Sequence, residues 1–166
     1  GSGHILVYAF DVLMDIYRSV GYTDRDAVQS IMENNLYGLD IDDRAAQLAY
    51  FALMMKACEY DRRFLRRGVQ PHVCAIAESV QVDEHLLDVF GAEKPLALRL
   101  VHTFANAKEY GSILQPKVTL EELDKLEARL QEADSMAGYG NLGVQGLSYQ
   151  LLDVMYPLID QARMLV

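Results

Sequence analysis

Two short segments of the sequence carry residues that could hold a small polar ligand, and the first is a glycine turn. Gly1-Ser2-Gly3 stands directly before a strongly amphipathic stretch that begins at Ile5. A glycine turn that leads into a helix lets backbone N–H groups approach a ligand, and the helix dipole favours negative charge there. Because Gly-Ser-Gly is also a common linker sequence, this segment alone supports both interpretations equally.

The second segment places an acidic residue at the end of a predicted strand, about 35 residues further along the chain. Leu36–Ile41 is a short apolar run between polar residues, which predicts a buried strand with Asp40 at its tip. In nucleotide-binding folds a carboxylate at this place accepts hydrogen bonds from ribose hydroxyls, since it has only acceptor oxygens. The alternative is that Asp40 and Asp42 only cap the next helix. The glycine turn, helix, strand and acidic tip together are more specific for a ligand site than either part alone.

The elements that must position these residues alternate regularly in the first half of the chain. Apolar residues at three- and four-residue steps predict a helix over 5–20, which Gly21 ends, and Thr23 with Asp26 predicts the start of a short helix that ends near Glu33. A long helix over about 44–65 follows the first strand.

Val73–Ala77 is predicted to be a second buried strand, so the order strand, helix, strand indicates a parallel βαβ unit. The second half changes character, with predicted helices over 83–90, 95–109, 119–133 and 146–165, a capping box at Thr119–Glu122 and a loop at 138–143. The sequence therefore predicts an α/β segment over residues 1–80 and a helical segment over residues 81–166.

Composition limits the function classes. The 166 residues are 51% apolar and 23% charged, which is typical of a soluble globular protein. No apolar run is long enough to span a bilayer and no signal segment is recognisable, so we expect a cytoplasmic location and no membrane partner. The net charge of −9 repels a phosphate backbone, and this segment is therefore not expected to be the part of a protein that grips DNA.

The sequence does not predict a metal site. Cys58 and Cys74 are too few for a zinc site or a disulfide framework, and the four histidines show no ligand spacing on a helix. One basic cluster, residues 62–67 with four arginines, departs from the acidic background. It could contact phosphate, or it could be a solvated helix end that complements the helix dipole.

These segments resemble the motifs of amino-methylating DNA methyltransferases. Gly1-Ser2-Gly3-His4-Ile5-Leu6 is similar to the tail of their glycine-rich first motif, and Leu36-Tyr37-Gly38-Leu39-Asp40-Ile41-Asp42 is similar to their second motif. The run from Met54 to Phe64 is similar to the PglX-type adenine-specific methylases of phage-exclusion systems and to fused type II restriction–modification enzymes. The resemblance is dense over residues 1–79 and thinner beyond.

The resemblance implies an α/β, predominantly helical fold. Residues 1–80 would be the cofactor side of a partial Rossmann-like S-adenosylmethionine-dependent methyltransferase domain. Residues 81–166 would be a helical insertion that leads towards the catalytic motif.

The resemblance also implies the cofactor S-adenosylmethionine and a set of residues that bind it. Gly1 and Gly3 would line its methionine part, Asp40 would hold the ribose and Ile41 would pack against the adenine ring. Asn106 is the candidate for the polar residue that the family's third motif places near the adenine amino group.

The chain lacks the family's catalytic Asn/Asp-Pro-Pro-Tyr/Phe motif, since none of its four prolines are adjacent. In the family this motif binds the target amino group and stacks on a flipped base. The resemblance therefore implies that this chain is an inactive fragment without catalytic residues. Its parent would methylate the exocyclic amine of adenine in DNA, for restriction–modification or phage defence, and would hold DNA through regions outside this fragment.

Three further expectations follow. Sheet edges and apolar helix faces without neighbouring strands should make the fragment self-associate. A competing interpretation, a free-standing helical interaction module without a cofactor, predicts an exposed Asp40 at a helix cap. A nicotinamide-binding fold is disfavoured, because Leu6 stands where the third glycine of its fingerprint would fall.

Overall fold

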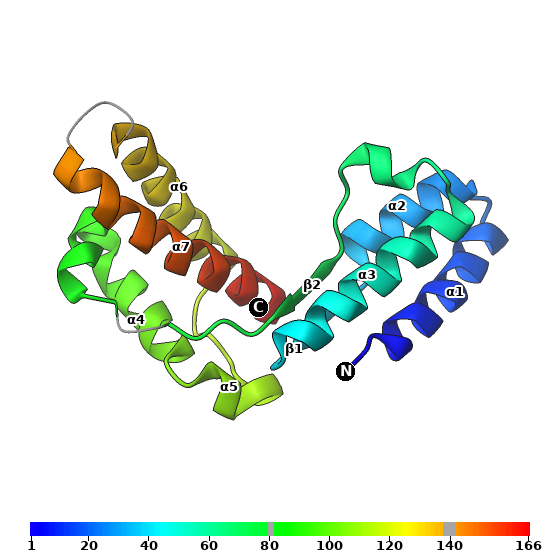
Figure 1. Ribbon diagram of the computed structural model, residues 1–166, viewed down its shortest axis with the longest axis horizontal. Helices are drawn as coiled ribbons and strands as arrows, with labels where there is room; N and C mark the ends of the chain where they lie inside the picture. Colours follow the sequence, from blue (N-terminus) through cyan, green and yellow to red (C-terminus); the bar gives the residue numbers. More distant parts are fainter. Residues whose placement is uncertain (80–81, 138–141) are drawn as a thin grey trace. The chain divides into compact units, whose positions relative to one another are not determined.

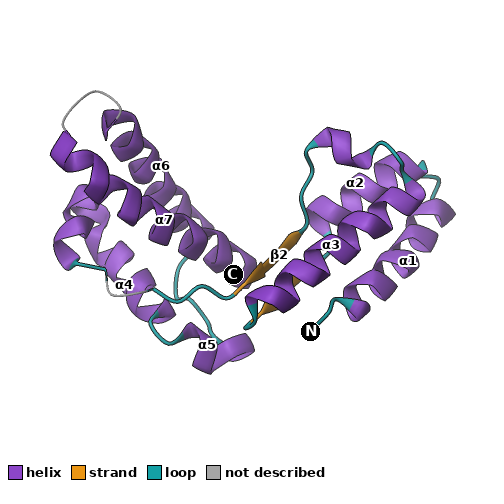
Figure 2. Ribbon diagram, viewed as in Figure 1, coloured by secondary structure: helices purple, strands orange, loops and turns teal. Residues whose placement is uncertain are grey.

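The computed structural model describes residues 1–79, 82–137 and 142–166 of the chain (Figure 1). They form two compact units, Gly1–Ile76 and Ala77–Val166. Helices make up most of both units (Figure 2). None of the helices in the described ranges is long and apolar enough to cross a membrane.

The first unit is built around a βαβ element, as the sequence predicts. Its elements in chain order are α1 (His4–Ser19), α2 (Asp24–Asn34), β1 (Tyr37–Asp40), α3 (Asp43–Tyr60), the 3₁₀ helix η1 (Phe64–Arg67) and β2 (His72–Ala75). The strands β1 and β2 are parallel and adjacent, with Tyr37 opposite His72 and Asp40 opposite Ala75. Because parallel strands need a crossover, the chain between them returns through α3.

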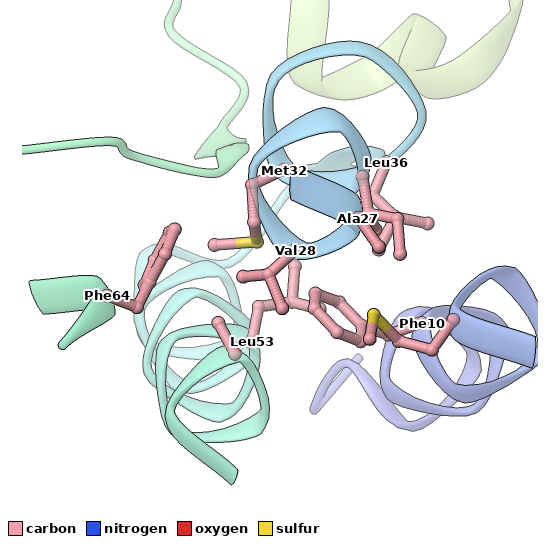
Figure 3. Packing of buried hydrophobic residues seen from close by; sticks show 10 residues of the cluster. Phe10, Ala27, Val28, Met32, Leu36, Leu53 and Phe64 are labelled. Atoms are coloured by element: carbon pink, nitrogen blue, oxygen red, sulfur yellow. The ribbon is translucent and has the colours of Figure 1, made fainter. Parts of the chain in front are cut away.

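The core of this unit lies where α1, α2 and α3 meet (Figure 3). The largest fully buried side chains of the cluster are Phe10, Met14, Ile31, Met32, Leu53 and Phe64. Full burial of one large apolar side chain stabilises a fold by about 1.5–3 kcal/mol. The packing of this cluster therefore holds the three helices together around the short sheet.

The helix α3 ends at Tyr60, so the prediction that it continues to Leu65 is wrong. Asp61 leaves the helical conformation, with φ −136° and ψ 95°. Its carboxylate accepts a hydrogen bond from the Arg63 N–H (3.0 Å) and pairs with Arg67. The change of direction allows Phe64 to enter the core as the first residue of η1.

The second unit is helical. Its elements are η2 (Glu84–Glu93), α4 (Lys94–Phe104), α5 (Ala107–Tyr110), η3 (Gly111–Ile113), α6 (Leu120–Ala137) and α7 (Leu142–Leu165). The capping box at the start of α6 is confirmed, because the Thr119 N–H donates to Glu122 Oε2 (2.9 Å) and the Glu122 N–H donates to Thr119 Oγ1 (3.2 Å).

Two boundaries in this unit differ from the sequence prediction. The helix predicted over 95–109 is two helices, because Asn106 has φ −127° and ψ 38° and interrupts the hydrogen-bond pattern. Of the loop predicted over 138–143, residues 138–141 lie outside the described residues. Leu142 and Gly143 belong to α7 instead.

A polar cluster ties α1 to α3. Asp11 Oδ1 accepts a hydrogen bond from the Tyr60 hydroxyl (2.6 Å) and lies 2.8 Å from Lys56 Nζ, which also pairs with Glu59. Burial raises the pKa of the Asp11 carboxyl, but the bonds from Lys56 and Tyr60 outweigh burial and hold the pKa below its ordinary value of 3.8. Ionised Asp11 is thus stabilised by folding.

We predict that Asp11→Asn lowers the free energy of unfolding by about 1 kcal/mol at neutral pH, since Asp11 is partly exposed and its ion pair is screened. A folded-state pKa below the unfolded one gives stability that is present above the unfolded pKa and is lost as the pH falls through the folded pKa. Urea unfolding at neutral and acid pH measures this. Asp15→Asn, on the exposed side of the same helix, is the matched control, and equal effects of both variants at neutral pH would contradict the prediction.

The outer faces of α1 and α3 carry exposed apolar side chains. On α1 these are Ile5, Tyr8, Val12 and Ile16, and on α3 they are Leu48, Phe51 and Met55. On each helix they recur at steps of three and four residues, opposite the core-facing Phe10 and Leu53. Apolar stripes of this kind mark surfaces that associate.

We therefore predict that the chain self-associates through these stripes. The weight-average mass in sedimentation experiments should rise with protein concentration, and the double variant Ile16→Glu/Phe51→Glu should shift the chain towards monomer. Because both side chains are exposed, the variant should keep the circular dichroism spectrum. A strictly monomeric profile at high concentration would count against the prediction.

Candidate functional site

The glycine turn and the tip of β1 meet at one cleft, although they are far apart in sequence. The Gly1 amine lies against the Asp40 carboxylate. The cleft has a volume of about 520 Å³. It is lined by Gly1, Ser2, Gly3, His4, Ile5, Leu6, Tyr37, Gly38, Leu39, Asp40, Ala46, Ala49 and Val73.

Gly3 is required by two independent constraints. It has φ +79°, a left-handed conformation that favours glycine, at the residue before α1. A Cβ atom at Gly3 would also lie 2.8 Å from both Cα and Cβ of Ala49 on α3. The turn therefore rests directly on the backbone of α3, with no space for a side chain between them.

Gly38 gives α1 a similar close approach to β1. A Cβ atom at this position would lie 2.9 Å from Leu6 Cδ1 and 3.3 Å from Val73 Cγ2. The absent side chain lets the first turn of α1 pack on the strand. The N-terminus of α1 is thereby held beside the carboxyl end of β1.

The start of α1 can bind an anionic group. Its first backbone N–H groups have no partner within the helix, as at any helix start, and the helix dipole is positive there. Within this fully described helix no side chain caps the N-terminus and the first turn carries no acidic residue. The Ser2 hydroxyl bonds instead to Nδ1 of His4 (2.7 Å).

Asp40 does not cap α3. The N-cap residue is Asp42, whose Oδ1 accepts a hydrogen bond from the Arg44 N–H (2.8 Å). Asp40 Oδ1 accepts from the Asp42 N–H (2.9 Å), and the Asp40 side chain is only 19% exposed. The capping interpretation is therefore right for Asp42 and wrong for Asp40.

The structure brings three of the five predicted binding residues, Gly1, Gly3 and Asp40, to the cleft. Ile41 follows Asp40 with 57% of its surface exposed and lies outside the described lining. Asn106 belongs to the second unit, where it is exposed. Its backbone carbonyl accepts hydrogen bonds from the N–H groups of Glu109 and Tyr110 in α5. The binding role of all five residues stays a prediction.

Sequence reasoning missed the part that α3 plays in the cleft. Ala46 and Ala49 line it, one helical turn apart, and Ala49 contacts the glycine turn. Small residues at this spacing directly after an acidic strand tip were the available signal. Among residues 1–79, 82–137 and 142–166 no group of three side chains could hold a metal ion.

No protein-family model matches the chain. Curated proteins do. In an alignment 190 residues long, the chain is 37% identical to the adenine-specific methyltransferase BrxX of Escherichia coli O9:H4 (strain HS). The alignment covers 99% of the chain and 15% of that protein. The chain is 42% identical over 120 residues to the adenine-specific methyltransferase PglX of Lacticaseibacillus casei (strain Zhang), covering 69% of the chain and 10% of that protein.

The chain is homologous to one segment of the PglX-type adenine-specific methyltransferases. It spans 15% of the length of the first relative and 10% of the second. A third relative, from Methanocaldococcus jannaschii, is named as a type II restriction enzyme and methyltransferase; it is 37% identical over 75 residues, which are 41% of this chain and 6% of that protein. These relatives favour the methyltransferase interpretation over a free-standing helical module.

The conformation of Gly3 and its close contact with Ala49 predict that a side chain at Gly3 destabilises the fold. Gly3→Ala should cost about 1–2 kcal/mol from the left-handed conformation alone, and the contact with Ala49 adds to it. The second-site change Ala49→Gly should rescue only part of the loss, because one of the two short contacts is to Cα. Thermal melting of the two single variants and the double variant measures this, and Gly1→Ala, which meets no atom within 4 Å, is the control. Full rescue by Ala49→Gly would contradict the described packing.

Proposed function

We propose that the parent protein transfers a methyl group from S-adenosylmethionine to the exocyclic amine of adenine in DNA, in restriction–modification or phage defence. In this proposal the chain supplies the cofactor side of the methyltransferase domain. The observation that carries it is the meeting of the glycine turn and Asp40 at one cleft, in a chain whose relatives are named adenine-specific methyltransferases.

The residues of the cleft fit the chemistry of this cofactor. The Asp40 carboxylate can accept hydrogen bonds from two ribose hydroxyls. The free N–H groups at the start of α1 suit the carboxylate of the methionine part. Leu6, Ala46 and Ala49 offer apolar surface, and about 520 Å³ is within the range of roughly 300–1,000 Å³ that small-molecule sites occupy.

The place of the cleft in the fold also supports the proposal. In open α/β sheets ligands bind at the carboxyl ends of parallel strands. Asp40 is the last residue of β1, and β2 runs parallel beside it. We accordingly assign residues 1–80 to a partial Rossmann-like domain and residues 81–166 to a helical insertion that leads towards the catalytic motif.

Each part of the site has a binding role. Gly1 and Gly3 allow the backbone to approach the methionine part, Asp40 holds the ribose, and the exposed Ile41 covers the adenine ring. Asn106, which belongs to the second unit, stays the sequence-based candidate for binding the adenine amino group. The bound cofactor supplies the electrophilic methyl group, whereas the residues that orient the target base and hold DNA belong to other regions of the parent protein.

A nicotinamide cofactor fits less well. In that fingerprint the third glycine permits close packing of helix on strand. Here the position is Leu6, and the close approach is achieved from the strand by Gly38. The residue pattern at the start of α1 is therefore not that of the nicotinamide fingerprint.

We predict that Asp40→Asn weakens S-adenosylmethionine binding by the parent protein at least tenfold, or about 1.4 kcal/mol, because the amide loses the negative charge and one acceptor oxygen. Isothermal titration measures the affinity. Asp15→Asn removes the same charge from the exposed side of α1 and should leave it unchanged. Equal affinities of Asp40→Asn and the unchanged protein would exclude Asp40 as the ribose-binding residue. Tighter binding of NAD than of S-adenosylmethionine would exclude S-adenosylmethionine as the cofactor.

We further predict that the 166-residue chain transfers no methyl group by itself, because its sequence lacks the Asn/Asp-Pro-Pro-Tyr/Phe motif that binds the target amine in the family. Incubation with tritiated S-adenosylmethionine and adenine-containing duplex DNA should give counts equal to those of a protein-free control. The parent protein in the same assay is the positive control. Transfer by the chain above background would contradict the assignment of the catalytic residues to other regions.

A further inference from the structure

We propose that a basic face in and directly before η1, made up of the exposed Arg62, Arg63 and Arg66, contacts the phosphate backbone of DNA without reading its sequence. This face lies in the first unit and uses none of the residues that line the cleft. The choice of DNA among polyanions rests on the proposed function, whereas the identification of the basic face does not.

The local geometry sorts the arginines of this segment into two groups. Residues three apart share a side of a 3₁₀ helix. Phe64 is buried, and Arg67, three residues on, turns inward, where it pairs with Asp61 and donates to the Arg25 carbonyl (3.1 Å). Arg66 and Arg63, the residue directly before η1, are therefore left on the outward side of this segment, where both are exposed. Arg62, their neighbour in sequence, is exposed as well.

These arginines differ from most basic residues of the chain because no carboxylate in the described part of the structure pairs with them. Among the described residues, ion pairs with aspartate or glutamate engage Arg18, Lys56, Arg67, Lys94, Arg99, Lys125, Arg129 and Arg163. Neither these pairs nor the side-chain hydrogen bonds include the guanidinium groups of Arg62, Arg63 and Arg66. The nearest carboxylates in sequence, Glu59 and Asp61, are already occupied by Lys56 and Arg67.

Three unpaired guanidinium groups on one short segment fit a ligand with regularly spaced negative charges. Guanidinium groups bind phosphate oxygens with two parallel hydrogen bonds, and phosphate contacts supply the sequence-independent part of DNA affinity. The net charge of −9 still predicts that the main grip on DNA is outside this chain. The basic face adds a local contact with phosphate that the net charge of the whole chain does not indicate.

Binding of the chain to a fluorescently labelled 20-base-pair duplex at low salt, followed by anisotropy, tests the proposal. Three phosphate contacts predict a slope of about −3 in a plot of log affinity against log salt concentration. The variant Arg62→Gln/Arg63→Gln/Arg66→Gln should lose at least tenfold in affinity and most of this slope. The variant with lysine at the three positions should keep most of both, because lysine also binds phosphate as a point charge.

The matched control is Lys108→Gln/Lys117→Gln/Lys125→Gln, which removes the same charge from exposed positions of the second unit and should change affinity less than twofold. Equal losses in the two glutamine variants would show that only net charge matters and would overturn the proposal. So would the absence of any binding at low salt, or competition by polyglutamate as strong as that by unlabelled duplex, which would indicate an acidic protein as partner. S-adenosylmethionine is left out of the assay, so a failure here is distinct from a failure of the proposed cofactor site.

Discussion

The close contact between the glycine turn and α3 is the constraint on which the candidate site depends. Gly3 lies so near the backbone of Ala49 that no side chain fits between them, and at Gly38 the end of the Leu6 side chain packs on β1. These two contacts fix the N-terminus of α1 against both α3 and the strand. The unpaired N–H groups of that helix and the Asp40 carboxylate then face one cleft, so the site is a consequence of helix–strand packing rather than of a flexible loop.

The same packing explains how a chain with a net charge of −9 can present distinct electrostatic surfaces. Most of its basic residues are paired with carboxylates, among them Lys56, which joins Asp11 on α1 to α3. Where α3 ends at Asp61, the chain turns so that Phe64 fills the core, and Arg63 and Arg66 remain outside. The positions of buried residues thus decide which charges remain unpaired at the surface.

Local patterns in the sequence predicted the elements of the first unit because they depend on neighbouring residues. The apolar periodicity of α1, the cap at Thr23 and the strand that ends in Asp40 were all predicted correctly, and so was the capping box at Thr119 in the second unit. The end of α3 was not, since it depends on a distant event, the entry of Phe64 into a core made by three helices. Ala49 was not assigned to the site, because apolar periodicity does not report a contact across 46 residues. Asp40 could be placed at the strand tip, but its distinction from the capping Asp42 required the hydrogen bonds.

The central claim is that the cleft between the glycine turn and Asp40 is the cofactor site of an adenine-specific methyltransferase. A crystal structure of the parent protein with S-adenosylhomocysteine tests it most directly. The account predicts both ribose hydroxyls within about 2.5–3.0 Å of the Asp40 carboxylate and the carboxylate of the ligand at the N-terminus of α1. A ligand bound elsewhere, with Asp40 facing only solvent or protein, would contradict it.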